Sequence, residues 1–419
     1  MSSNKYLNMS FVLIIGIFLL TNAVRPSVQI MSIILAIFLL SYYFYFKAIK
    51  KGDIFFLNRD EKLLSISLFL MFISALPPLL INNSLSVGYS ELDLPSKYIL
   101  FALIALLLFK IKPQISKDRL FDLICLGGIV NGVIAIFHIF IFPDMLYHGR
   151  YTGYSGINET GFICGAFGIV NLALYLFYKN KYMFLIASVL SIVGVAGSGL
   201  RGVMLGIFFS FFIILIVGFI FKKISFQKIL KITLIFLCLF IATVYIVFKE
   251  LPSKRMEYTK TEINAISGGD YTTSIGQRLV MYKEALAIFS LSPLVGMSAK
   301  SQLDNAEQIS KISGFDKAIK EAQKGEPLWG KKHNDVLTIM AKRGLIGLLC
   351  LLFFYFTLIN IFYKQHFVIF ISGISIIVFC IGVGFSGDPI SGHPESTFFM
   401  LFLFSLLSTK DSNTRKNIS

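Results

Sequence analysis

The chain has 419 residues, of which 56% are hydrophobic and 15% are charged, whereas ordinary soluble domains are about 25% charged. Forty-three phenylalanines stand against a single tryptophan. These values exclude a soluble globular enzyme, a disordered chain and a coiled coil, and they indicate a polytopic membrane protein. The formal net charge of +16 must then be interpreted loop by loop, and no nucleic-acid partner is expected.

The hydrophobic runs predict the number of membrane crossings. A helix needs about 20 mainly apolar residues to cross roughly 30 Å of hydrocarbon. Twelve runs fit this pattern, and the fourth and the last are short enough that they must extend or tilt. The runs are 9–24, 27–46, 63–81, 97–109, 120–142, 161–178, 182–199, 203–221, 232–248, 344–363, 367–386 and 396–409. We therefore predict an all-α fold of about 12 transmembrane helices.

The basic residues of the short loops predict the orientation. An even number of spans places both termini on one side, and Lys5 and the tail assign that side to the cytoplasm. The cytoplasmic loops and termini then hold twenty lysines and arginines. The short outer loops hold four, namely Arg25, Lys97, Arg150 and Arg201. The bias predicts that both termini are cytoplasmic.

One long segment, residues 249–335, lies on the outer side in this topology and divides the chain into three parts. Residues 1–248 carry spans 1–9, residues 249–335 form a periplasmic loop domain, and residues 336–419 carry spans 10–12 and the cytoplasmic tail. Within the loop, Ile275–Phe289 has apolar residues at helical spacing, and Gln302–Lys324 fits a polar surface helix. Such long loops in compact proteins are usually functional or disordered, and we favour function.

Two arginines on the outer side are candidates for binding an anion. Arg201 follows a Gly/Ser turn, Gly197-Ser198-Gly199-Leu200, where backbone N–H groups and a helix N-terminus suit a phosphate. Arg278 falls in the first turns of the predicted loop helix, and a planar guanidinium is well suited to phosphate oxygens. A simpler interpretation stays open for each, because Arg201 could anchor a helix at the membrane edge and Arg278 could lie on a solvated face.

A third feature is His333, just before the chain re-enters the membrane in Lys331-Lys332-His333-Asn334-Asp335. An imidazole can accept a proton near neutral pH, and Asn334 could orient its ring, although such a histidine can also be an ordinary interface residue. Asp388 lies in a later polar outer turn that could border the same cavity. The five cysteines fall in apolar runs without paired spacing, and no metal motif is present, so no metal or cofactor is expected.

The order of these segments resembles the O-antigen ligase and O-antigen polymerase superfamily of bacterial surface-polysaccharide enzymes. The resemblance is carried by the arginine after the Gly/Ser turn and by three motifs of the outer loop and the next span. These motifs are Arg278-Leu279-x-Met281-Tyr282, His333-Asn334-x-x-Leu337 and Gly344-Leu345-Ile346-Gly347. Within the superfamily the chain is most similar to O-antigen ligase.

The resemblance implies a reaction at the periplasmic face of the bacterial inner membrane. An O-antigen ligase moves polysaccharide from undecaprenyl diphosphate to lipid A–core, by an inverting, metal-independent glycosyl transfer that serves lipopolysaccharide biosynthesis. At the matching positions, Arg201 and Arg278 would bind the donor diphosphate and His333 would activate the acceptor hydroxyl. Asn334 and Asp388 would support the site. The protein is also expected to contact membrane lipid.

Two other functions are compatible with the sequence. An O-antigen polymerase uses the same carrier-linked donor with a second carrier-linked glycan as acceptor, and acceptor choice depends on pocket shape that the sequence does not specify. A polysaccharide transporter or flippase is less favoured, because transporters place polar or broken helices at the midplane. Here the span interiors carry almost no charge, and the distinctive residues gather on the outer side.

Overall fold

The computed structural model describes residues 2–22, 25–50, 57–81, 85–146, 150–153, 156–178, 182–250, 255–316, 320 and 332–409. These residues form helices and connecting turns, with no β-strand among them. The helices are α1 (Ser2–Thr21), α2 (Arg25–Lys50), α3 (Arg59–Ile73), α4 (Pro77–Ile81), α5 (Leu85–Ile111), α6 (Lys117–Ile136), η1 (Phe137–Ile141), η2 (Pro143–Met145), α7 (Ile157–Phe177), α8 (Tyr182–Ser198), α9 (Arg201–Ile220), α10 (Phe226–Glu250), α11 (Arg255–Ser267), α12 (Ser274–Leu291), α13 (Ala299–Asp304), α14 (Ala306–Ser313), α16 (Asp335–Tyr363), α17 (Phe367–Gly384) and α18 (His393–Leu407).

The all-helical prediction is confirmed for the described residues, and the chain is a multi-pass membrane protein. Nine of its described helices are long and apolar enough to cross a membrane. The other three predicted runs correspond to shorter apolar helices, Lys5–Thr21, Tyr182–Ser198 and Pro394–Leu407. The count of twelve crossings therefore stays a prediction. The short fourth run does extend, since it lies inside the apolar segment Glu91–Ile111 of α5.

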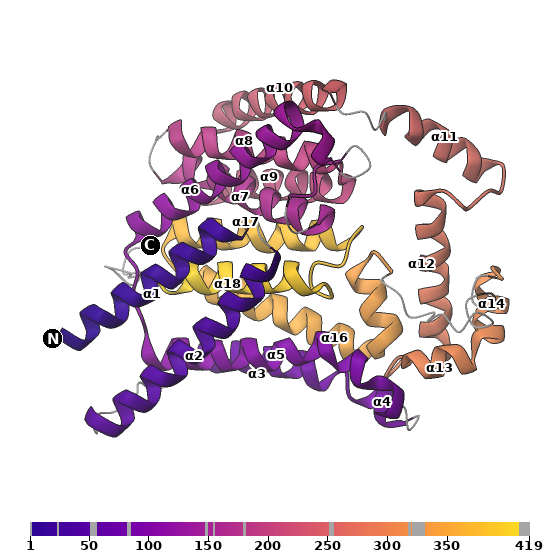
Figure 1. Ribbon diagram of the computed structural model, residues 1–419, viewed down its shortest axis with the longest axis horizontal. Coiled ribbons are helices and arrows are strands. Elements are labelled where there is room, and N and C mark those ends of the chain that lie inside the picture. Colours follow the sequence, from indigo (N-terminus) through magenta and orange to yellow (C-terminus); the bar gives the residue numbers. More distant parts are fainter. Residues whose placement is uncertain are drawn as a thin grey trace.

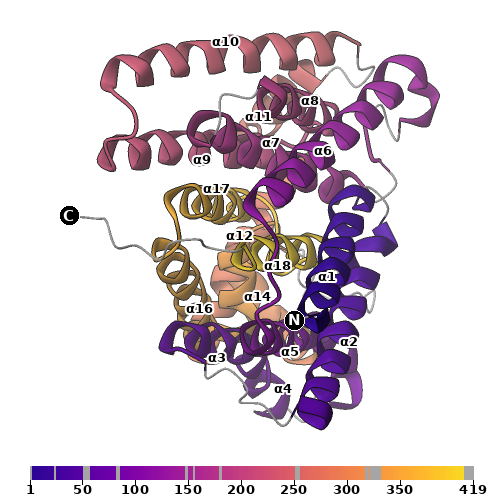
Figure 2. The same cartoon turned by 90° about the vertical axis from the view of Figure 1, so that its left-hand side faces the viewer.

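The helices pack as a bundle with α17 and α18 near its middle (Figure 2). Phenylalanine rings fill the space between α7 and α18, where Phe167 lies 5.7 Å from the rings of both Phe398 and Phe402. The most buried long helices are α7 and α17, whereas α10 runs along the outer edge (Figure 1). Core packing thus explains part of the aromatic composition, because each buried ring removes a large apolar area from solvent, while other phenylalanines such as Phe219 and Phe356 are exposed.

The loops that were predicted to share one side of the membrane lie at one end of the bundle. The Asn8 side chain accepts a hydrogen bond from the Gln114 amide at 2.8 Å, and Ile115 bridges to Thr409. At the same end Lys364 pairs with Asp60. Helices α11–α14 lie at the opposite end (Figure 1). The membrane side that each end faces stays a prediction.

The outer loop contains the predicted helix Ile275–Phe289, which is α12, but the predicted single helix Gln302–Lys324 is wrong over its described part. Two short helices, α13 and α14, meet at Asn305, and α14 ends at Gly314 with a φ of 74°. Ile309 of α14 is buried in one hydrophobic cluster with Ile288 of α12. Residues 317–319 and 321–324 of that prediction lie outside the described residues, as does Lys331.

Helix α16 bends at Gly344, where it meets the turn after α12. Gly344 has a φ of 61° and a ψ of −156°, a conformation almost restricted to glycine. At the bend two backbone N–H groups of α16 find their hydrogen-bond acceptors in the turn after α12. The amides of Leu345 and Ile346 donate to the carbonyls of Pro293 and Leu294 at 2.8 and 3.1 Å. These bonds attach the outer loop to a membrane helix beside His333.

We expect Gly344→Ala to destabilise the protein. A Cβ at this position would lie 2.4 Å from the Leu294 carbonyl carbon, and the backbone conformation alone costs on the order of 1–3 kcal/mol for other residues. The midpoint of thermal unfolding in detergent should fall. Gly16→Ala is the matched control, since a Cβ there meets only the Leu123 side chain at 3.6 Å. Equal midpoints for both variants would contradict this account of the bend.

Candidate active site

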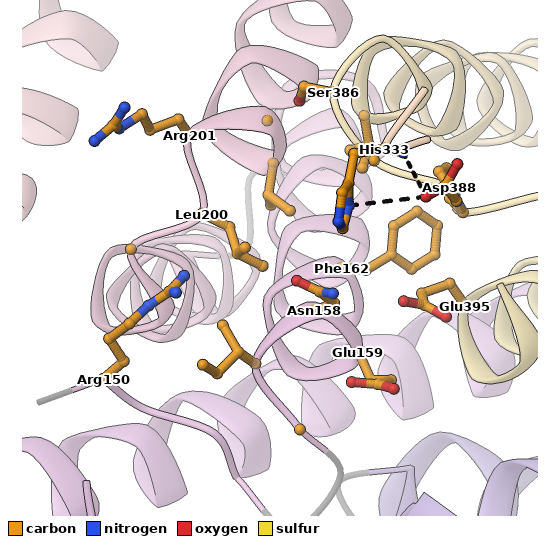
Figure 3. Close-up of a pocket in the computed structure, with 18 of the residues that line it drawn as sticks. Arg150, Asn158, Glu159, Phe162, Leu200, Arg201, His333, Ser386, Asp388 and Glu395 are labelled. Carbon is orange, nitrogen blue, oxygen red and sulfur yellow. Dashed lines mark hydrogen bonds and ion pairs between the residues drawn. The ribbon is translucent and has the colours of Figure 1, made fainter. Parts of the chain in front are cut away.

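A cavity of about 810 Å³ opens at the end of the bundle that carries the outer loop (Figure 3). Its walls come from the first turns of α7, α9, α12 and α18 and from the turns beside them. The polar and charged side chains that line it include Arg150, Asn158, Glu159, Arg201, Ser274, Arg278, His333, Ser386, Asp388 and Glu395. Four of the five predicted site residues thus share one cavity, although they are separated by up to 187 positions in the sequence.

His333 is held by Asp388. The Asp388 carboxylate accepts a hydrogen bond from the His333 amide at 3.1 Å, and the same oxygen lies 3.8 Å from Nδ1 of the imidazole. Its other oxygen accepts the Thr338 hydroxyl at 2.8 Å. Asp388 is buried, whereas the His333 ring is partly exposed to the cavity. The carboxylate therefore lies close to Nδ1, and the ring borders the cavity.

The backbone of His333 is strained, and its neighbours maintain the strain. Its φ of 51° is rare for a residue with a side chain, and it costs on the order of 1–3 kcal/mol. On one side the His333 backbone amide donates a hydrogen bond to Asp388. On the other side the Tyr282 hydroxyl donates to the His333 carbonyl at 3.2 Å. Such conformations cluster at functional sites.

The turn that carries Asp388 is fixed by the residues that follow His333. The Asp335 carboxylate accepts the amides of Ile390 and Ser391 at 2.9 and 3.0 Å. Asn334 caps α16 by accepting the Leu337 amide at 3.0 Å, and its side chain also donates to the Phe385 carbonyl. Asn334 is therefore placed beside the cavity and outside its lining, in a position that supports the fold of the site.

Tyr282 was part of a predicted motif but was not expected to be a site residue. Burial raises the pKa of Tyr282, so its phenol stays protonated and can donate to the His333 carbonyl. The sequence held a signal for this, since Tyr282 follows Arg278 by four positions and the two lie on one helical face. A tyrosine near an expected site is too common to be selected on spacing alone.

The two predicted arginines differ in their orientation. Arg278 lines the cavity from α12 and is half-buried. Arg201 also borders it, but both terminal nitrogens of its guanidinium donate to one carboxylate oxygen of Glu262 in α11, at 3.1 and 3.0 Å. Figure 3 shows the Arg201 side chain extending away from His333. The structure thus brings Arg201 to the rim, with its charge compensated by α11.

Three charged residues of the cavity were missed by the sequence analysis. Arg150 had been counted only for its contribution to orientation, and Glu159 and Glu395 lie in the first turns of α7 and α18. Figure 3 shows Arg150 and Arg201 on one side of the cavity and the carboxylates of Glu159 and Glu395 on the other. Within the part of the chain that the structure describes, no group of three or more His, Cys, Asp or Glu side chains is placed to hold a metal ion.

Comparison with known proteins finds a match for the part of the chain that holds most of the predicted site residues. Residues 186–352 match the family described as O-Antigen ligase. This segment holds Arg201, Arg278, His333 and Asn334, whereas Asp388 and Arg150 lie outside it.

Two relatives extend the comparison. An uncharacterised protein of Haemophilus influenzae (strain Rd) is 28% identical over 384 residues, which covers 87% of this chain and 88% of that protein. A protein of Escherichia coli (strain K12) named O-antigen ligase is 28% identical over 134 residues, and the match spans 32% of this chain and 31% of the relative. These matches support a ligase- or polymerase-type role in the handling of O-antigen, with a glycosyltransferase-like activity. The resemblance noted in the sequence is thereby confirmed, and the comparisons support an O-antigen ligase-type protein.

Proposed function

We propose that the protein is an O-antigen ligase, which transfers polysaccharide from undecaprenyl diphosphate to a sugar of lipid A–core. The observation that carries this proposal is that one cavity is lined both by arginines and by a histidine paired with a buried carboxylate. The arginines suit a departing diphosphate, and the histidine–carboxylate pair suits a hydroxyl that must lose its proton. Both are needed in one place for a glycosyl transfer.

The arginines stabilise the leaving group in this proposal. As the bond between the anomeric carbon and the donor phosphate oxygen breaks, negative charge grows on the diphosphate. Arg278 lines the cavity where this charge develops, and Arg201 can join it when a phosphate replaces the Glu262 carboxylate. Removing one preorganised donor of this kind typically costs about 2.7–4 kcal/mol of transition-state stabilisation. The proposed transfer therefore needs no metal.

His333 acts as the base. Its Nε2 accepts the proton of the acceptor hydroxyl while the hydroxyl oxygen bonds to the anomeric carbon, and Asp388 stabilises the imidazolium that forms. The proton then leaves to solvent, and the released product is undecaprenyl diphosphate. A single displacement without a covalent intermediate inverts the configuration at the anomeric carbon. The strained, doubly held backbone of His333 supports this role, because it keeps the ring in one orientation.

The proposed setting is the bacterial inner membrane, with twelve crossings, both termini in the cytoplasm and the cavity open to the periplasm. The lysine-rich loops at the opposite end of the bundle support this orientation. Residues 249–335 then form the periplasmic domain that covers the polar headgroup, while the isoprenoid chain stays among the membrane helices. This arrangement explains why a polar active site is built on a hydrophobic bundle.

The reaction can be tested directly with purified protein in detergent. We expect transfer of glycan from undecaprenyl diphosphate-linked donor to purified lipid A–core, at an unchanged rate in excess EDTA. A rate abolished by EDTA and restored by a divalent ion would contradict the metal-free mechanism. Because no ion gradient exists in detergent, glycan transfer between the two lipids under these conditions would exclude the transporter interpretation.

A deletion strain distinguishes ligase from polymerase. Loss of a ligase should leave lipopolysaccharide as bare core while long polymer accumulates on the carrier lipid. Core bearing a single repeat unit would instead identify a polymerase, which uses the same donor with a different acceptor. The family description of residues 186–352 favours the first outcome.

His333→Ala should lower turnover by about 100- to 10,000-fold, which is the usual contribution of a general base. The affinity for undecaprenyl diphosphate should change little, because the arginines that bind it remain. Transfer rates under donor saturation and binding of undecaprenyl diphosphate measure the two effects separately. A variant with normal turnover would exclude His333 as the base, and one with equal losses of binding and turnover would indicate a donor-binding role.

A further inference from the structure

We propose that Arg150 is a further donor-binding residue, which presents its guanidinium to the diphosphate from the wall formed by the α6–α7 connection. This inference rests on the proposed donor, a lipid-linked diphosphate. Arg150 lies outside every motif that carried the family resemblance and outside the segment that matches the family. It nevertheless lines the same cavity as Arg278 and His333.

The position of Arg150 is fixed by the Gly/Ser turn that precedes Arg201. Its Nε donates to the Ser198 carbonyl at 2.8 Å, and the amide of the next residue, Tyr151, donates to the Gly197 carbonyl at 3.0 Å. Tyr151 itself is buried. Residues 150 and 151 are therefore joined to the turn, and the bond to Ser198 orients the guanidinium of Arg150.

Arg150 and Arg201 are oriented differently, although both adjoin the Gly/Ser turn. Figure 3 shows the Arg150 guanidinium directed towards Leu200 and the cavity, while Arg201 extends away from His333. Arg201 is also compensated by Glu262 at 3.0 Å, and its side chain is 40% exposed. Both arginines line the cavity, and they reach it from different elements.

The chemistry of a diphosphate headgroup fits this arrangement. A diphosphate diester carries two negative charges on oxygens of two adjacent phosphates, and guanidinium groups bind such oxygens through parallel N–H bonds. Arg278 reaches the cavity from α12, and Arg150 reaches it from the α6–α7 connection. Two arginines from separate elements can hold the headgroup before any rearrangement of Arg201 and Glu262.

The test is binding of undecaprenyl diphosphate to the purified full-length protein in detergent. Arg150→Gln should weaken binding about 10- to 100-fold, as expected for the loss of charge-assisted hydrogen bonds, and Arg150→Lys should restore part of it. Arg278→Gln serves as the comparison. Arg59→Gln is the matched control, because Arg59 is an exposed arginine at the opposite end of the bundle and should leave binding unchanged.

A second ligand separates binding from a structural role. Undecaprenol has the same isoprenoid chain without phosphate, so its affinity should be the same in Arg150→Gln and wild type. Wild-type affinity of Arg150→Gln for the diphosphate, or equal losses for both ligands, would overturn the proposal. If the wild-type protein failed to bind undecaprenyl diphosphate, the proposed identity of the donor would be overturned as well. Binding without glycan transfer would contradict only the proposed reaction.

Discussion

The candidate site depends on one buried carboxylate, that of Asp388. Its two oxygens contact the His333 amide, the imidazole edge and the Thr338 hydroxyl, so one side chain joins the turn after α17 to the start of α16. A buried charge is costly unless it is hydrogen-bonded, and these donors meet that requirement. The same bonds hold His333 in a left-handed conformation, which explains how a strained residue keeps a single orientation at the cavity wall.

The outer loop is connected to the membrane helices through backbone contacts as well as side chains. At the bend of Gly344, two backbone N–H groups of α16 donate to carbonyls of the turn after α12. The hydroxyl of Tyr282 in α12 donates to the His333 carbonyl. Arg278 and His333, which come from opposite ends of the loop, are thereby brought to one cavity. The hydrophobic bundle supplies the rigid frame, and the loop supplies much of the polar lining.

The sequence predicted what depends on composition and local pattern. Apolar runs gave the helices, and the helical spacing of Ile275–Phe289 gave α12, because local periodicity determines both. The contribution of Arg150 was not predictable in this way, because it depends on a bond to Ser198, 48 positions away. The outward pairing of Arg201 depends likewise on Glu262, a residue in no recognised motif. The burial of α14 residues in one cluster with α12 was not predicted either, because it joins segments that are distant in the sequence.

The central claim is that a lipid-linked diphosphate binds in this cavity, between the arginines and His333. An experimental structure of the full-length protein in lipid nanodiscs with undecaprenyl diphosphate tests it most directly. The account predicts that the diphosphate lies within hydrogen-bonding distance of Arg278, with His333 beside the phosphate that would carry the sugar. A diphosphate bound at the lysine-rich opposite end of the bundle, with this cavity empty, would contradict it.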